Sequence, residues 1–135
     1  MGNRLGRPRR GLPERARALK PGAALSDVRD RDGLAAVVQR GVDELGRLDF
    51  VLANAGILPA AGAGGASITA FTDAVAVMLT GVYYTIDAAL PALLSNADGG
   101  AVVITSSAAG FTSVSTEFGT MSHGAAGYTA AVTTV

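Results

Sequence analysis

Two hydroxyl-bearing residues, Ser107 and Tyr128, could together move a proton to or from a substrate oxygen. Ser107 follows an apolar run at 101–104 that predicts a strand, and Tyr128 comes 21 residues later, where a helix should begin. In open α/β sheets, ligands bind outside the carboxyl ends of the strands, which is where Ser107 falls. A serine hydroxyl can polarise a substrate oxygen, but a tyrosine needs a nearby cation to act as a base near neutral pH. From these two residues alone, a purely structural role stays equally open.

A second set of candidate residues follows other apolar runs. Asn54, Ala55 and Gly56 come directly after a strongly apolar segment. Small residues there let a ligand approach the backbone, and an asparagine side chain can brace the neighbouring strand. Asp27 and Val28 follow a shorter apolar run, where the aspartate either contacts a ligand or caps a helix.

The elements that must position these residues alternate along the chain. Asp30 or Asp32 can cap the first helix, Gly46 can end it, and Ser67 can cap the second. Pro91 predicts a bend or weakening in that second helix. Both main strands are continuously apolar, which is typical of strands buried on both faces of a parallel sheet. The expected order is strand, helix, strand, helix, strand, at residues 23–26, 34–45, 48–54, 67–95 and 101–105.

In combination, these motifs resemble the short-chain dehydrogenase/reductase family over residues 24–131. The resemblance implies an α/β fold and an oxidoreductase that transfers hydride between NAD or NADP and a small-molecule alcohol or carbonyl substrate. Ser107 would bind the substrate oxygen and Tyr128 would exchange its proton. The same resemblance implies that Asp27 and Val28 cap the adenine ring. It also implies that Asn54, Ala55 and Gly56 line the adenosine side. The long interval before Tyr128 is similar to that in the mycofactocin-associated branch.

Several positions depart from the family pattern. Val132 stands where the family has a lysine, one helical turn after the tyrosine, and Met78 stands where it has a relay asparagine. Residues 1–22 contain no strand followed by a Gly-rich turn, which a dinucleotide fold uses to hold the pyrophosphate. Residues 62–65 could in principle cradle a phosphate, although a flexible connection explains them more simply. We therefore expect a partial Rossmann-like parallel sheet with flanking helices, truncated at both ends, without its first strand and Gly-rich turn.

Charge and composition divide the chain into two regions. Residues 1–20 carry seven Lys or Arg against one acidic residue, although the whole chain has no net charge. We expect residues 1–22 to be a basic, disordered leader and residues 23–135 to be the partial dinucleotide-binding domain. The chain has no cysteine, and no metal site is predicted. The basic opening could also be a nucleic-acid arm or an Arg-rich transit peptide, but the zero net charge gives no overall attraction to nucleic acid. Asp73, Asp87 and Pro91 interrupt the longest apolar segment. We therefore expect a cytoplasmic protein without membrane or nucleic-acid partners. Any homo-oligomer should form through the 67–95 helix.

Two functions follow from these observations. The first is a short-chain oxidoreductase, impaired by the departures at Val132 and Met78 and by the missing first strand and Gly-rich turn. The alternative is a catalytically inactive fragment that acts, if at all, as an interaction module. A nucleophile triad is not predicted, because no G-x-S-x-G motif surrounds Ser107.

Overall fold

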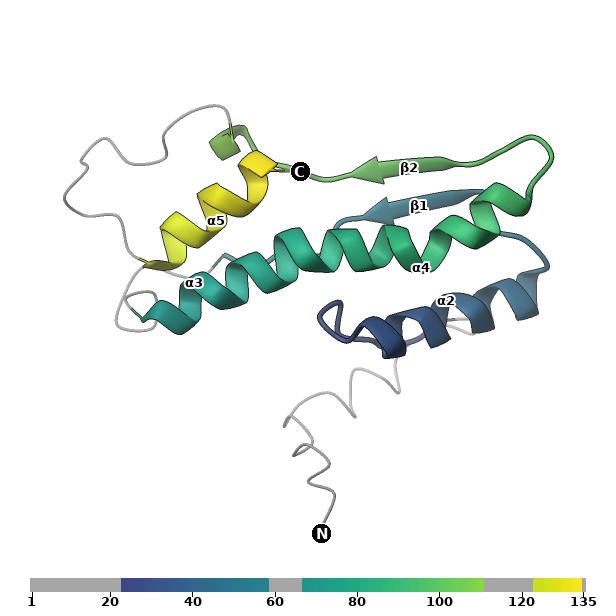
Figure 1. Ribbon diagram of the computed structural model, residues 1–135, viewed down its shortest axis with the longest axis horizontal. Helices are drawn as coiled ribbons and strands as arrows, with labels where there is room; N and C mark the ends of the chain where they lie inside the picture. Colours follow the sequence, from purple (N-terminus) through teal and green to yellow (C-terminus); the bar gives the residue numbers. More distant parts are fainter. Residues whose placement is uncertain (1–22, 59–66, 111–122, 135) are drawn as a thin grey trace, which may run out of the picture.

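A computed structural model describes residues 23–58, 67–110 and 123–134 of the chain (Figure 1). Its elements form a two-stranded sheet with helices beside it, and a long helical segment separates the strands in sequence. In chain order they are α2 (Arg31–Leu45), β1 (Phe50–Ala53), α3 (Ile68–Val75), the π-helical turn η1 (Ala76–Thr80), α4 (Gly81–Ser95), β2 (Ala101–Ile104), the 3-10 turn η2 (Ala108–Gly110) and α5 (His123–Thr134).

The strands β1 and β2 pair in parallel, with Phe50 opposite Ala101 and Ala53 opposite Ile104. The parallel pairing and the α/β class are as predicted, although the strands are shorter than the predicted segments, 48–54 and 101–105. In Figure 1, α4 runs alongside the strands and α2 lies beyond it. The carboxyl ends of both strands therefore lie at the same edge of the sheet, near α5.

The helix α2 begins and ends where its sequence predicts. The side chain of Asp30 accepts a hydrogen bond from the Gly33 amide at 3.0 Å, as an N-cap does. Gly46 ends the helix with a φ of 86°, and its amide donates to the carbonyl of Val42. That left-handed backbone is readily adopted only by glycine.

The segment from Ile68 to Ser95 is one continuous helical stretch made of α3, η1 and α4. Ser67 caps it by accepting from the Ala70 amide at 3.3 Å, as predicted. The α-helical geometry continues through Pro91, and the irregular turn lies instead at η1, earlier in the segment than the expected weak point.

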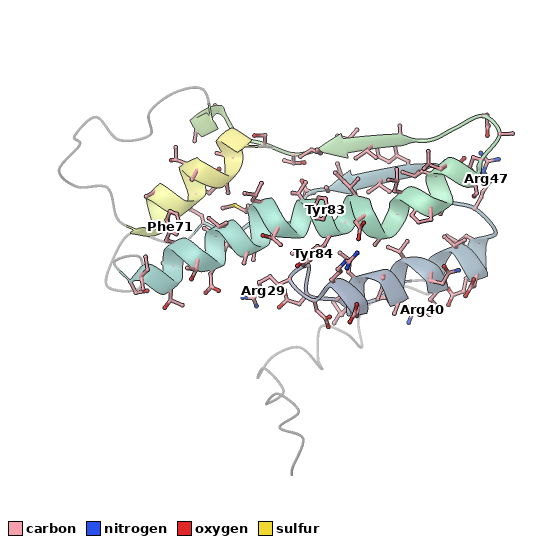
Figure 2. The ribbon with its side chains drawn as sticks, viewed as in Figure 1. Arg29, Arg40, Arg47, Phe71, Tyr83 and Tyr84 are labelled. Atoms are coloured by element: carbon pink, nitrogen blue, oxygen red, sulfur yellow. The ribbon has the colours of Figure 1, made fainter. Side chains whose placement is uncertain are left out.

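The same stretch has the length and mean hydropathy, 1.4, of a helix that could cross a membrane. A core helix of a soluble fold meets the same criteria. Here Asp73 pairs with Arg29, which lies just before α2 (Figure 2), and Asp87 pairs with Arg31, the first residue of α2. Since α3 also packs on α5 and α4 on β1, the structure uses this stretch as the central helix of the α/β unit.

Two clusters of buried side chains hold the elements together. The first joins α3, η1 and α5 through Ala74, Val77, Met78 and Ala131. The second joins β1 and α4 through Val51, Ala89 and Leu93.

The prediction that both strands are buried on both faces is wrong for the described part of the chain. Burial alternates along β1, where Phe50 is 55% and Leu52 is 53% exposed, and every residue of β2 is exposed. The reason is that α4 is the only described helix that packs on the strands, and it packs mainly on one face of β1. The opposite face therefore presents apolar side chains to solvent.

Two local predictions also need correction. Residues 23–27 form no strand; a turn follows, in which the Asp30 amide donates to the carbonyl of Asp27. The second is the helix of Tyr128, which was predicted to begin at that residue but begins at His123. Its end contains Val132, Thr133 and Thr134, and β-branched residues disfavour helix. It is helical through Thr134, and the burial of Val132, which is 7% exposed, shows that packing outweighs propensity there. The predictions for residues 1–22 and 62–65 lie outside the described residues.

Candidate active site

A cavity of about 230 Å³ lies at the carboxyl ends of the two strands. It is formed by the segments after β1 and β2, by η1 and by one face of α5. Its lining residues are Asn54, Ala55, Gly56, Ile57, Leu58, Met78, Thr105, Ser106, Tyr128 and Val132. The structure thus brings together four of the seven predicted site residues, Asn54, Ala55, Gly56 and Tyr128, from positions more than 70 residues apart in sequence.

Asn54 braces the mouth of the cavity. Its Oδ1 accepts a hydrogen bond from the hydroxyl of Thr105 at 2.7 Å, and the Thr105 amide donates to the carbonyl of Ala53. These two bonds continue the contact between the strands beyond the last paired residues. The predicted bracing role of the asparagine is therefore matched by a contact, although its partner is a hydroxyl rather than a backbone amide.

Ala55 and Gly56 leave room at this edge. Both are exposed, and a Cβ added at Gly56 would lie 3.8 Å from the Met78 sulfur, which is ordinary contact. Since neither residue has a side chain beyond Cβ, a flat ligand can reach the backbone here.

Tyr128 reaches the cavity from α5. It is half-buried and packs against the cluster that includes Met78 and Ala131. Val132 lies one turn further along the same helix face and also lines the cavity. Among the residues that the structure describes, none that lines the cavity carries a charge, so none of them places a cation beside the tyrosine.

Ser107 is turned away from this wall. Its Oγ accepts a hydrogen bond from the Ala109 amide at 3.3 Å and so supports the turn η2. The adjacent Ser106 lines the cavity instead, and its hydroxyl donates to the carbonyl of Val132 at 2.7 Å. Ser106 was not among the predicted site residues. The two adjacent serines after the apolar run were the pattern that could have indicated it.

Met78 forms an apolar part of the cavity and is only 5% exposed. It lies on η1, and π-helical turns inserted in α-helices are frequently found at functional sites. A thioether cannot relay a proton as an amide could, so this wall contributes packing only.

Asp27 and Val28 lie apart from the cavity. The Asp27 carboxylate pairs with Arg29 at 2.7 Å, and this hydrogen bond is the main cause that raises the pKa of the arginine. Val28 packs against α4, where its Cγ2 would be 2.7 Å from a Cβ added at Gly81. It also contacts the cluster that contains Met78 and Tyr128 and so supports the cavity from behind. Among the described residues, no group of three His, Cys, Asp or Glu could hold a metal ion.

The chain belongs to the short chain dehydrogenase family, whose sequence profile matches residues 14–131. This confirms the family resemblance, while the mycofactocin-associated branch stays a prediction. An uncharacterised oxidoreductase of Mycobacterium tuberculosis is 44% identical over 110 residues, which are 81% of this chain and 37% of that protein. The (-)-trans-carveol dehydrogenase of Rhodococcus erythropolis is 42% identical over 63% of this chain and 31% of its own length.

Solved structures agree with the fold. Carveol dehydrogenase from Mycobacterium avium, crystallised with NAD, has a TM-score of 0.69 and 34% identity over 82% of this chain and 37% of its own. A short chain dehydrogenase from Mycobacterium paratuberculosis, bound to NAD, has a TM-score of 0.66 and 34% identity. The partial Rossmann-like fold is thereby confirmed, and this chain spans little more than a third of these relatives.

Proposed function

We propose that this chain forms part of the site of an NAD-dependent oxidoreductase that acts on an alcohol or carbonyl substrate. One observation carries the proposal: Tyr128 and the hydrogen-bonded pair of Asn54 and Thr105 meet at a single cavity, at the carboxyl ends of two parallel strands. This is where open α/β sheets bind their ligands. The relatives crystallised with NAD favour NAD over NADP.

The cavity fits one uncharged part of a dinucleotide. Its volume of about 230 Å³ is below the roughly 300–1,000 Å³ of most small-molecule sites. Ala55 and Gly56 offer an open backbone wall for a ring or sugar, whereas the described lining has no charged side chain to pair with a phosphate. When bound, the nicotinamide cofactor would supply the hydride chemistry.

The residues of this chain would supply orientation and proton transfer. In this proposal Tyr128 exchanges a proton with the substrate oxygen. Ser107 is the residue that the family resemblance assigns to that oxygen, but in this structure its Oγ supports η2 and does not line the cavity. Asn54 joins the ends of the two strands. Asp27 and Val28, which the family resemblance assigns to the adenine ring, lie apart from this cavity and would contact the cofactor outside it. Carveol is a cyclic secondary alcohol, and the apolar side chains of Ile57, Leu58 and Met78 suit a substrate of that kind.

We expect turnover by this chain to be slow. Val132 places an aliphatic side chain, rather than a cation, one helical turn from Tyr128. Positioned acid–base groups contribute about 10²–10⁴-fold to rates, so a tyrosine without a cation gives up part of that gain.

The experiment is a titration of the chain with NADH and with NADPH, followed by an assay of NAD reduction with carveol. We expect weak NADH binding and slow NADH formation, which Tyr128→Phe abolishes. Tyr83→Phe is the matched control, because Tyr83 is 64% exposed on α4 and does not line the cavity. Equal rates in the two variants would contradict the role of Tyr128.

A second candidate function is that of an inactive interaction module. The observation that favours it is the uncovered face of the sheet, where Phe50 and Leu52 are more than half exposed. Absence of both NADH binding and turnover, with a folded chain, would support this alternative.

A further inference from the structure

Ser106 links the end of β2 to the helix that carries Tyr128. Its hydroxyl donates to the carbonyl of Val132 at 2.7 Å, across 26 residues of sequence. Val132 follows Tyr128 by four residues, so the two lie on one face of α5, and both line the cavity. The bond therefore connects the segment after β2 to the face of α5 that lines the cavity.

A separate contact fixes the other side of α5. Gly127 lies against α3 so closely that an added Cβ would be 2.7 Å from the carbonyl oxygen of Phe71. Ala131, one turn later, is fully buried in the cluster with Ala74 and Val77. This contact holds α5 on α3 along one line of small residues, Gly127 and Ala131. The bond from Ser106 is made at Val132, about 100° further around the helix, so it fixes the rotation of α5 at a second point.

We propose that Ser106 is a positioning residue, which holds α5 in the rotation that directs Tyr128 into the cavity. The proposal rests on the function proposed above and adds a residue that acts through the helix rather than on the substrate. Ser107 has a different task, because its Oγ accepts from the Ala109 amide within its own turn.

The test compares two variants of the same shape at this position. Ser106→Thr keeps the hydroxyl, and Ser106→Val replaces it with a methyl group; residue 106 is exposed, so both side chains have room. The readout is the 19F NMR signal of Tyr128 in chain labelled with 3-fluorotyrosine, assigned by its loss in Tyr128→Phe. Hydrogen exchange of the α5 amides is measured on the same samples.

We expect Ser106→Val to shift the Tyr128 signal and to lower the protection of α5 amides about five-fold, the effect of losing one ordinary hydrogen bond. Ser106→Thr should restore both. The matched control is Ser95→Ala, which removes a hydroxyl-to-carbonyl bond of the same length, 2.7 Å to Ala92, on an exposed part of α4. It should leave the Tyr128 signal unchanged.

An unchanged Tyr128 signal in Ser106→Val, or equal effects of Val and Thr, would overturn the proposal. NADH binding is titrated in parallel and should be weaker in Ser106→Val than in Ser106→Thr. If no variant and no parent chain binds NADH, the proposed function fails, while the NMR signal still decides whether Ser106 positions Tyr128.

Discussion

The hydroxyl of Thr105 donates to Oδ1 of Asn54 over 2.7 Å and joins the two strands just beyond their last paired residues. Both side chains line the cavity, so the bond that joins the ends of the two strands also fixes part of the cavity wall. Stability and binding are therefore coupled at this edge.

Thr105→Val should lower the free energy of unfolding by about 0.5–1 kcal/mol, because the bond is exposed and water can replace part of it. Thr105→Ser retains the donor and should lose less. Urea unfolding of the two variants measures the difference. Equal stabilities would show that the bond contributes nothing.

Gly127→Ala should destabilise the chain by about 1–3 kcal/mol, the usual cost of overpacking. The added Cβ would meet the backbone of Phe71, which lies on α3 (Figure 2), at 2.7 Å and Ala74 Cβ at 3.1 Å, and backbone atoms cannot move aside easily. Gly41→Ala is the control, since nothing lies within 4 Å of its added Cβ in the middle of α2. That variant should gain about 0.5–1 kcal/mol from helix propensity. Loss of stability in both variants would contradict the packing argument.

The carboxyl group of Asp98 gives a pH dependence with a definite sign. Its pKa is lowered, first by a backbone hydrogen bond at Asp98 and then by Arg47, which also contacts Asp49 (Figure 2). A lowered folded-state pKa means stabilisation that is complete above the unfolded value of about 3.9 and is lost as pH falls through the folded value. The parent should therefore be more stable than Asp98→Asn at pH 7, and the difference should shrink below about pH 4. A difference that persists at pH 2 would contradict this assignment.

The apolar runs were enough to predict the parallel pair of strands, and the cap residues Asp30, Gly46 and Ser67 were enough to place two helices. These signals are local, because each depends on a few neighbouring residues and on backbone groups that need partners. The exposure of Phe50 and Leu52 could not be predicted in this way. A continuous apolar run in the sequence does not show whether other elements cover one face of the strand or both.

The candidate site was predictable only in part. The position of Asn54 followed from its place after a strand. Tyr128 was correctly placed on a helix, but that helix begins at His123 rather than at the tyrosine. The choice between Ser106 and Ser107 did not, since the strand ends at Ile104 and the direction of each later side chain depends on the turn that follows. The π-helical turn that carries Met78 likewise has no pattern in the sequence that distinguishes it from α-helix.

Val132→Lys should raise the rate of NADH formation by about ten-fold or less, because Met78 still leaves the wall apolar and Val132 is a buried position. Adding Met78→Asn should bring the gain to about 10²-fold, the lower end of the usual acid–base contribution. Val132→Met is the control, with a long side chain but no charge. A gain as large in Val132→Met would mean that shape, rather than charge, limits the reaction.

Leu94→Lys should reduce self-association of the chain, if the helix that spans 67–95 is the surface that copies share. Tyr83, Leu90 and Leu94 recur at steps of seven and four along α4 and are 64%, 43% and 74% exposed, so they form one apolar face. Leu45→Lys on α2 is the matched control, because Leu45 is 79% exposed but lies on another helix. Light scattering over a range of concentrations should give a lower average mass for Leu94→Lys than for the parent and the control. Leu52→Lys tests the uncovered sheet face in the same assay. If that variant alone lowers the mass, copies associate through the sheet and the helix prediction is wrong.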